Sequence, residues 1–163
     1  MAGVSPERVC AQIDGDFVVF IIGMRINKIW KVHKWWPVAI AMPRMLKELL
    51  AHPELGCMGG HQWVGNPTIL VQYWKSFEAL DRYAKDPNLA HLPAWSAFNR
   101  KASRNADVGV WHETYRVSPG NYECIYNNMP PFGLGKATRL IPATGRYEHA
   151  AGRMALDKPA PPT

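Results

Sequence analysis

The stretch Asp16-Phe-Val-Val-Phe-Ile-Ile-Gly-Met-Arg-Ile-Asn27 predicts a β-strand that is apolar on both faces. Side chains alternate along a strand, so Arg25 and Asn27 share one face and Met24 belongs to the other. Such a strand must be covered on both faces, by helices, by a second sheet or by another subunit. The polar pair at its end either lies in water or needs partners, because an unpaired buried polar group costs about 1–3 kcal/mol.

The composition is that of a globular protein. Hydrophobic residues make up 47% of the 163 residues and charged residues 20%, which excludes a disordered chain and suffices for one domain with a sizeable core. The net charge of +6 would favour an anionic ligand, but the basic residues are spread along the chain without a nucleic-acid-binding motif. We therefore expect no nucleic-acid partner, and we interpret the charge mainly as a contribution to solubility.

The cysteines and the N-terminus bear on the cellular compartment. Cys10, Cys57 and Cys124 are isolated and odd in number, which argues against a disulfide scaffold or a zinc site and fits a reducing compartment. The first 16 residues lack the long apolar stretch of a signal peptide, and the apolar run 17–24 is shorter than the roughly 20 residues that span a bilayer. We expect a cytoplasmic protein without stable membrane insertion.

Hydrophobic periodicity and turn signals predict an order of strand, helix, strand, strand, helix, strand. Pro37 and Pro43 divide the first helical segment into a short helix and a longer, bent one. Ser76 is a suitable N-cap for the helix that follows the third strand. The predicted elements are strand 17–26, helical segment 27–50, strands 55–65 and 68–74, helices 77–85 and 93–102, strand 108–117 and a short fifth strand 122–126.

This order predicts an α+β fold of the ferredoxin-like, split βαβ type, with helices on one face of an antiparallel sheet. The other face needs a cover, and a second copy of the chain is the simplest one, so we predict a homodimer formed through the sheet. We predict an N-terminal extension at 1–15, the ferredoxin-like domain at 16–128, an irregular loop packing on it at 129–149 and a flexible tail at 150–163.

A tryptophan cluster, Trp30, Trp35 and Trp36, lies beside three lysines in the first helical segment. It would either anchor the protein at a membrane interface or pack the helix on the sheet. The sequence shows no long amphipathic face with a polybasic flank after the cluster. We therefore expect packing on the sheet.

Six motifs stand out along the chain: Phe17-Val-Val-Phe-Ile-Ile-Gly-Met-Arg-Ile-Asn-Lys, Trp35-Trp-Pro-Val, Pro43-Arg-Met-Leu-Lys-Glu-Leu, Gln72-Tyr-Trp-Lys-Ser-Phe-Glu, His91-x-x-Ala-Trp-x-x-Phe-Asn and Trp111-His-Glu-Thr-Tyr. They resemble those of an uncharacterised bacterial and fungal family that is labelled monooxygenase-like after a member in the fumagillin pathway. The family is grouped with the dimeric α+β barrel proteins, which include antibiotic biosynthesis monooxygenases, haem-degrading monooxygenases, chlorite dismutases and aldoxime dehydratases. The resemblance covers roughly residues 16–145 and implies the same ferredoxin-like dimer.

The resemblance also implies where a site lies, between the sheet and the helices of each subunit. In the haem-degrading members, an Asn on the first strand, an aromatic residue and a His on the second helical segment form the site. Asn27, Tyr83 and His91 occupy comparable places in this chain, with Trp74 as the other candidate for the aromatic residue. Tyr83 replaces the Trp of those members, and Asn27 sits late on its strand.

Cofactor-free antibiotic monooxygenases need a cavity that holds an electron-rich phenol or enol near oxygen, with polar groups that favour its anion. The resemblance therefore implies a monooxygenase-like oxidoreductase that acts on a small hydrophobic or aromatic metabolite. Its expected catalytic residues are Arg25, to stabilise a developing enolate or phenolate, Asn27, and His91, to accept and return a proton. The expected substrate-binding residues are Trp74, Tyr83, Trp95, Phe98 and His112.

Two alternatives remain open. In the first, the protein is a haem protein with His61, His91 or His112 as the axial ligand. In the second, it binds a small molecule without catalysing a reaction. Each of these histidines also has a purely structural interpretation. His61 would pack against Trp63, His91 would form a hydrogen bond to backbone at a helix start, and His112 would lie on a strand face. The sequence contains no H-x-E-x-H or H-x3-H spacing, so we expect no metal centre. We expect the other three histidines on the surface: His33, His52 and His149.

Overall fold

A computed structural model describes residues 3–4, 6–101 and 106–154 of the chain. The chain divides into two compact units, which we treat separately. We call Val18–Tyr115 the sheet unit, and Met1–Phe17 together with Arg116–Thr163 the terminal unit.

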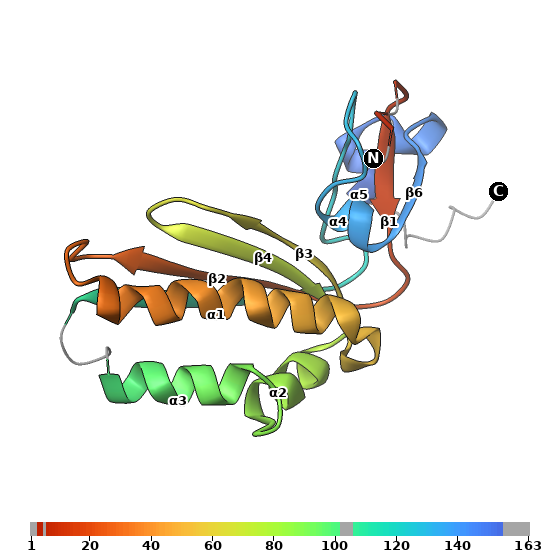
Figure 1. Cartoon of the computed structure of the whole chain (residues 1–163). Coiled ribbons are helices and arrows are strands. Elements are labelled where there is room, and N and C mark those ends of the chain that lie inside the picture. Colours follow the sequence, from red (N-terminus) through yellow and green to blue (C-terminus); the bar gives the residue numbers. More distant parts are fainter. Residues whose placement is uncertain (1–2, 5, 102–105, 155–163) are drawn as a thin grey trace. The chain divides into compact units, whose positions relative to one another are not determined.

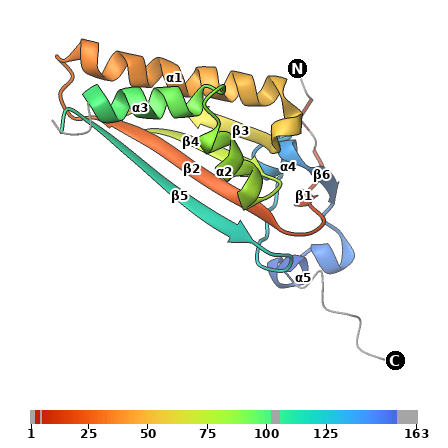
Figure 2. The ribbon, with the colours of Figure 1, turned by 90° about the horizontal axis from the view of Figure 1, so that it is seen from below.

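The sheet unit has the predicted ferredoxin-like α+β fold. Its four strands lie in the order β3-β4-β2-β5, and β4 runs antiparallel to both β2 and β3. The three helices cover one face of this sheet (Figures 1 and 2). The elements are β2 (Phe17–Ile26), α1 (Val32–Ala51), the 3-10 turn η1 (Pro53–Leu55), β3 (Cys57–Trp63), β4 (Thr68–Trp74), α2 (Phe77–Lys85), α3 (His91–Lys101) and β5 (Val108–Val117).

The core lies between the helices and the covered face of the sheet. The pairing of β2 with β4 sets Val18 opposite Trp74, and both are buried together with Leu49 of α1. Trp74 is fully enclosed, and its indole N–H donates to the side-chain oxygen of Gln72 at 3.0 Å. Since this buried donor has its partner, the ring contributes its apolar area without an unpaired polar group.

Helix α1 differs from the prediction. It is one continuous helix that contains both Pro37 and Pro43, so the predicted division into two helices was wrong. A proline inside a helix removes a backbone hydrogen bond and costs about 3 kcal/mol or more. Met42 and Leu49 lie two turns apart on one side of α1 and are both buried against the sheet, and this packing outweighs the local penalty.

Asp107 connects the end of β2 to the start of β5. Its carboxylate is almost fully buried, with Nζ of Lys28 and Nζ of Lys31 each 2.9 Å from one of its oxygens. Its backbone carbonyl accepts hydrogen bonds from the backbone N–H groups of Asn27 and Lys28. The hydrogen bonds from the two lysines lower the pKa of Asp107 below its usual value.

Replacing Asp107 by asparagine is expected to lower the Tm at pH 7. The carboxyl pKa is depressed in the folded state, so the charged form stabilises the fold above the unfolded pKa of about 3.9. This contribution is lost as the pH falls through the folded pKa. The gap in Tm between wild type and Asp107→Asn should therefore shrink below about pH 4, whereas the exposed Asp14→Asn should give little difference at any pH. A gap that stays constant down to low pH would contradict the ionic role.

The terminal unit was not predicted from the sequence. Instead of an extension at 1–15 and an irregular loop at 129–149, β1 (Val9–Gln12) pairs antiparallel with β6 (Arg139–Pro142). The predicted strand 122–126 forms only an isolated bridge, between Val9 and Tyr126. Part of the predicted tail is helical, and residues 155–163 lie outside the described residues. The unit also contains α4 (Leu134–Ala137), the 3-10 turn η2 (Gly145–Tyr147) and α5 (Ala150–Met154).

A buried arginine holds the terminal unit together. The guanidinium of Arg153 lies 2.7 Å from the carboxylate of Glu123 and donates to the backbone carbonyls of Tyr147 and Glu148. Tyr126 accepts a hydrogen bond from the backbone N–H of Gly135 at 2.9 Å. These elements of four or five residues are too short for hydrophobic periodicity to reveal, which is why the sequence pattern appeared irregular.

Candidate functional site

Two adjoining cavities lie in the sheet unit between the helices and the covered face of the sheet. Their volumes are about 330 and 300 Å³, within the range of small-molecule sites. Both involve β2, α1 and α3, so we treat them as two parts of one site, the central cavity. The residues that line both parts are Ile22, Met42, Met45, His91 and Trp95.

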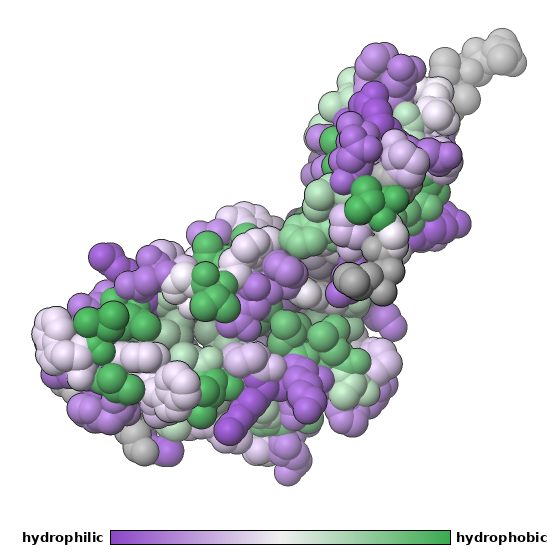
Figure 3. All heavy atoms as spheres, turned by 45° about the horizontal axis from the view of Figure 1, so that its top comes forward, coloured by the Kyte–Doolittle hydropathy of each residue, from purple (hydrophilic) through white to green (hydrophobic). Residues whose placement is uncertain are grey.

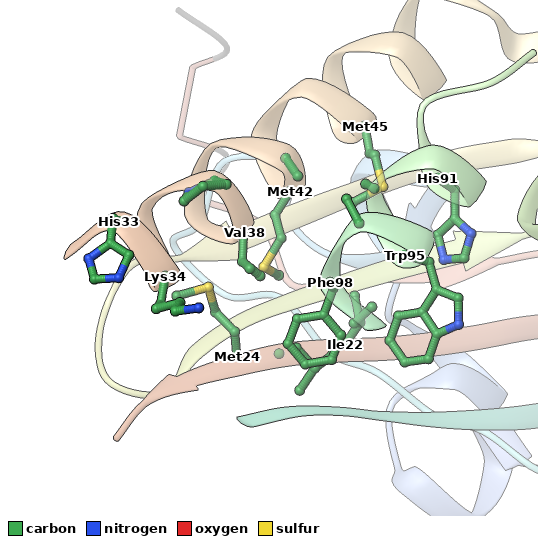
Figure 4. A pocket seen from close by; sticks show the side chains of 16 residues that line it. Ile22, Met24, His33, Lys34, Val38, Met42, Met45, His91, Trp95 and Phe98 are labelled. Atoms are coloured by element: carbon green, nitrogen blue, oxygen red, sulfur yellow. The ribbon is translucent and has the colours of Figure 1, made fainter. Parts of the chain in front are cut away.

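The first part of the central cavity is mainly apolar. Met24, Met42 and Met45 give it a flexible, polarisable wall, and Trp95 and Phe98 close it from α3 (Figure 4). The two aromatic rings are stacked with centroids 5.6 Å apart. Polar groups come from the start of α1: His33 and Lys34.

The second part carries more polar groups. Gln72 reaches it from β4, and His112 and Thr114 reach it from β5. The His112 ring lies 5.7 Å from that of Phe20, which lines the same part. An apolar chamber with a few polar groups is the usual character of a site for a small organic ligand.

His91, the first residue of α3, is the polar group common to both parts. Its Nδ1 lies 3.0 Å from the backbone carbonyl of Ala84. A carbonyl oxygen only accepts, so Nδ1 carries the hydrogen and the neutral ring keeps its lone pair on Nε2. The ring of His91 lies at the start of α3 beside Trp95 (Figure 4). A ligand in the central cavity therefore meets a side chain that is able to accept a proton.

Glu48 of α1 fixes the surroundings of His91. Its carboxylate accepts the hydroxyl of Tyr83 at 2.8 Å and the backbone N–H of Ala90 at 3.1 and 3.3 Å. The pKa of Tyr83 is raised, mainly by burial and secondly by its hydrogen bond to Glu48, so this residue stays a neutral phenol. Sequence reasoning missed Glu48, and its only signal there was that it is the sole acidic residue between Asp16 and Glu54.

Arg25 and Asn27 do not join this site. Arg25 is exposed on the sheet face opposite the helices, and Asn27 is exposed and donates from its side-chain amide to the carbonyl of Ala106 at 3.2 Å. Neither is among the residues that line the central cavity. The expectation that they converge with His91 was wrong, because the helices cover the face of β2 that carries Val18 and Met24.

The other predicted residues fall into two groups. Trp95, Phe98, Tyr83 and His112 all line the central cavity with His91, and their role in substrate binding stays a prediction. Trp74 does not line the central cavity but lies behind Tyr83, with the two ring centroids 5.6 Å apart.

His61 belongs to neither group, because it lies on the opposite face of the sheet. Its ring packs edge-on against Trp63 at 4.4 Å, which matches the packing interpretation of this histidine. Of the three candidate haem ligands, only His91 and His112 therefore line the central cavity.

The central cavity offers no protein cluster for a metal ion. Among the described residues, no group of three or more His, Cys, Asp or Glu side chains is arranged to hold one. A haem iron needs only an axial ligand, and His91, with Nδ1 bonded to a backbone carbonyl, has the arrangement typical of a metal-bound imidazole. The apolar lining with Met and aromatic side chains also suits a porphyrin, so the residues present are compatible with haem.

The sequence profile of a known family, described as Monooxygenase af470-like, matches residues 17–134. This range contains β2 to β5 and all residues that line the central cavity. The chain belongs to the monooxygenase af470-like family. Membership confirms the resemblance seen in the sequence motifs.

Two known proteins illustrate the relationship. The chain is 27% identical to "Monooxygenase af470" of Aspergillus fumigatus, over 83% of this chain and 56% of that protein, so it spans just over half the length of this relative. A crystal structure of the aldoxime dehydratase OxdRE in complex with butyraldoxime superposes with a TM-score of 0.65 at 15% identity. The match covers 77% of this chain and 38% of that one, and it shows a shared fold.

Proposed function

We propose that this protein is an oxygenase that binds a small aromatic or polyketide-like molecule in the central cavity and uses His91 as a proton acceptor. Membership of the monooxygenase af470-like family supports the reaction class. The methionine and aromatic lining supports an apolar substrate. The single observation that carries the proposal is the hydrogen bond from Nδ1 of His91 to Ala84, which leaves Nε2 as the acceptor.

The chemistry follows from that geometry. A proton moves from an acidic C–H or O–H group of the substrate to Nε2 of His91, and the substrate becomes an enolate or phenolate. Its electrons pass to dioxygen, and a C–O bond forms at the carbon that shares the negative charge of the enolate or phenolate. For a methylene beside an aromatic ketone the balance is CH2 + O2 → C=O + H2O, in which the substrate supplies all four electrons. His91 returns the first proton to the peroxide so formed. It then takes the second C–H proton while the O–O bond breaks and the C=O bond forms, and the leaving hydroxide accepts that proton and becomes water.

Oxygen uptake with 1,8-dihydroxyanthrone tests this proposal, because this probe has both an acidic methylene group and electron-rich phenol rings. We expect the purified protein to accelerate uptake over the uncatalysed rate by at least about a hundredfold. Product analysis should find one anthraquinone formed for each O2 consumed. A rate equal to that of heat-denatured protein, for this and related phenols and enols, would contradict the oxygenase function.

A haem protein is the second candidate, favoured by the presence of both His91 and His112 on the second part of the central cavity. When bound, haem would supply redox and ligand-activating chemistry at its iron. Addition of hemin to the purified protein would then produce a Soret band that His91→Ala or His112→Ala removes. Dioxygen uptake in protein without a Soret band would favour the first candidate instead.

We also propose that two copies pair through the open face of the sheet. This face carries the aromatic side chains of Trp63 and Tyr115, both exposed in the single chain, beside Ile21 and Val71 at the centre of the sheet. An exposed face of this kind is typical of a protein interaction site.

The three cysteines, which are free thiols, further support a reducing, cytoplasmic setting.

Replacing Val71 by lysine is expected to convert the dimer into a monomer. The new ammonium group would lie at the centre of the paired sheets, where its desolvation opposes association. Light scattering at micromolar concentration should give half the wild-type mass for Val71→Lys and the full mass for Val64→Lys, which adds the same charge at a highly exposed position. A monomeric wild-type protein would contradict the dimer.

A further inference from the structure

The start of α1 exposes a group of large apolar side chains. Ile29 and Trp30 are 71% and 72% exposed, and Val32 and Trp36 are 50% and 55% exposed. These four residues lie within eight positions of the chain, whereas isolated exposed apolar residues are ordinary on protein surfaces. Figure 3 shows that apolar side chains reach the surface of the sheet unit at several places among polar ones.

Of the three tryptophans in this segment, only Trp35 packs against the core, and it is partly buried. Trp35 packs against the buried cluster of Met24, Met42 and Leu70, and its indole N–H donates to the carbonyl of Ile29 at 2.9 Å. The expectation that the tryptophan cluster packs on the sheet therefore holds for Trp35 and was wrong for the other two: Trp30 and Trp36.

The stretch of sequence around this group is basic. Residues 17–47 contain six lysine or arginine side chains and no aspartate or glutamate. Asp107, which approaches from β5, is almost fully buried and held by Lys28 and Lys31. Arg44 and Lys47 extend the basic surface along the exposed side of α1. Exposed tryptophans among lysines and arginines are the combination that binds at the interface of an anionic bilayer.

We propose that this surface docks the protein on an anionic lipid bilayer. We call it the aromatic–basic patch and define it by Ile29, Trp30, Val32 and Trp36 with Lys28, Lys31, Lys34, Arg44 and Lys47. The docking is peripheral, since no helix in the part of the chain that the structure describes has the length and apolarity to cross a membrane.

The aromatic–basic patch adjoins the mouth of the central cavity. His33, Lys34 and Pro37 line the first part of that cavity, and they belong to the same two turns of α1 as Val32 and Trp36. A bilayer on the patch therefore brings dissolved apolar molecules to the entrance of the site. The docking itself depends only on the patch, so it holds or fails independently of the proposed oxygenase function.

Flotation of the full chain with vesicles tests the docking. We expect binding to phosphatidylcholine vesicles that contain about one-third phosphatidylserine, with at least about tenfold weaker binding to phosphatidylcholine alone. Binding should fall when the ionic strength rises from about 0.05 to about 0.5 M. The variant Trp30→Ala/Trp36→Ala and the variant Arg44→Gln/Lys47→Gln should each bind about tenfold more weakly than wild type.

Matched variants outside the patch serve as controls. Ile125→Ala/Met129→Ala removes two exposed apolar side chains in the terminal unit, and Lys75→Gln/Arg82→Gln removes two exposed charges away from the patch. Both should bind like wild type. The proposal is overturned if anionic vesicles do not bind the protein at low salt, or if the patch and control variants bind equally. It is also overturned if Trp30→Ala/Trp36→Ala changes the mass in solution, because the patch would then join copies of the chain.

Discussion

Replacing His91 by glutamine is expected to lower the rate of oxygen uptake with 1,8-dihydroxyanthrone by about 10²–10⁴-fold. Glutamine retains an N–H group to donate to the carbonyl of Ala84, but it has no basic nitrogen to accept a proton. The loss should therefore appear in kcat, with KM within about threefold of wild type, because the interaction matters only while the proton moves. Steady-state oxygen-electrode measurements at saturating probe give both values.

His149→Gln is the matched control, because His149 is exposed in the terminal unit and does not line the central cavity. It should keep the wild-type rate, and both variants should keep the wild-type Tm. Equal activity of His91→Gln and wild type would show that another group accepts the proton. Equal losses in the two variants would indicate that the substitutions act through the fold.

Replacing Gly23 by alanine is expected to destabilise the sheet unit strongly. A Cβ at this position of β2 would lie 2.5 Å from the carbonyl oxygen of Thr68 and 2.6 Å from the indole nitrogen of Trp111. The first of these atoms belongs to the backbone of the paired strand, so the strands themselves must shift. We expect a loss of about 2 kcal/mol or more in the free energy of unfolding and a Tm about 5 °C lower.

Gly109→Ala on β5 is the control for this effect. A Cβ there meets its nearest atoms, on Asn27 and Arg25, at 3.8 and 3.9 Å, which is ordinary contact. This variant should be as stable as wild type or slightly more stable, because alanine restricts the unfolded chain. Urea unfolding of the three proteins measures the difference. A Gly23→Ala variant as stable as Gly109→Ala would contradict the close packing of Trp111 over β2.

Much of the fold could be predicted from the sequence because the long elements carry clear periodicity. β4 alternates between buried and half-buried side chains over seven residues, and Ser76 begins α2 by accepting a hydrogen bond from the backbone N–H of Ala79. The continuity of α1 could not be predicted, since the local cost of Pro37 and Pro43 is visible in the sequence and the tertiary packing that offsets it is not. β1 and β6 are separated by more than 120 residues, and four-residue strands give no periodic signal.

The candidate site was predictable where it rests on local pattern. His91, Trp95 and Phe98 recur at helical spacing on one side of α3, and all three line the central cavity. Arg25 was assigned to the site because a strand apolar on both faces does not reveal which face the helices cover. Glu48 was missed because its partners follow 35 and 42 residues later in the chain, and no local pattern relates positions so far apart.

The most direct test of the central claim is the position of a bound substrate. Methyl signals of 13C-labelled methionines, recorded without oxygen while 1,8-dihydroxyanthrone is added, report on the central cavity. Binding there should shift the signals of Met24, Met42 and Met45, which line it, and leave those of Met129 and Met154 unchanged, since both are exposed in the terminal unit. Shifts at Met129 or Met154 without shifts at the three cavity methionines would contradict the assignment of this cavity as the oxygenase site.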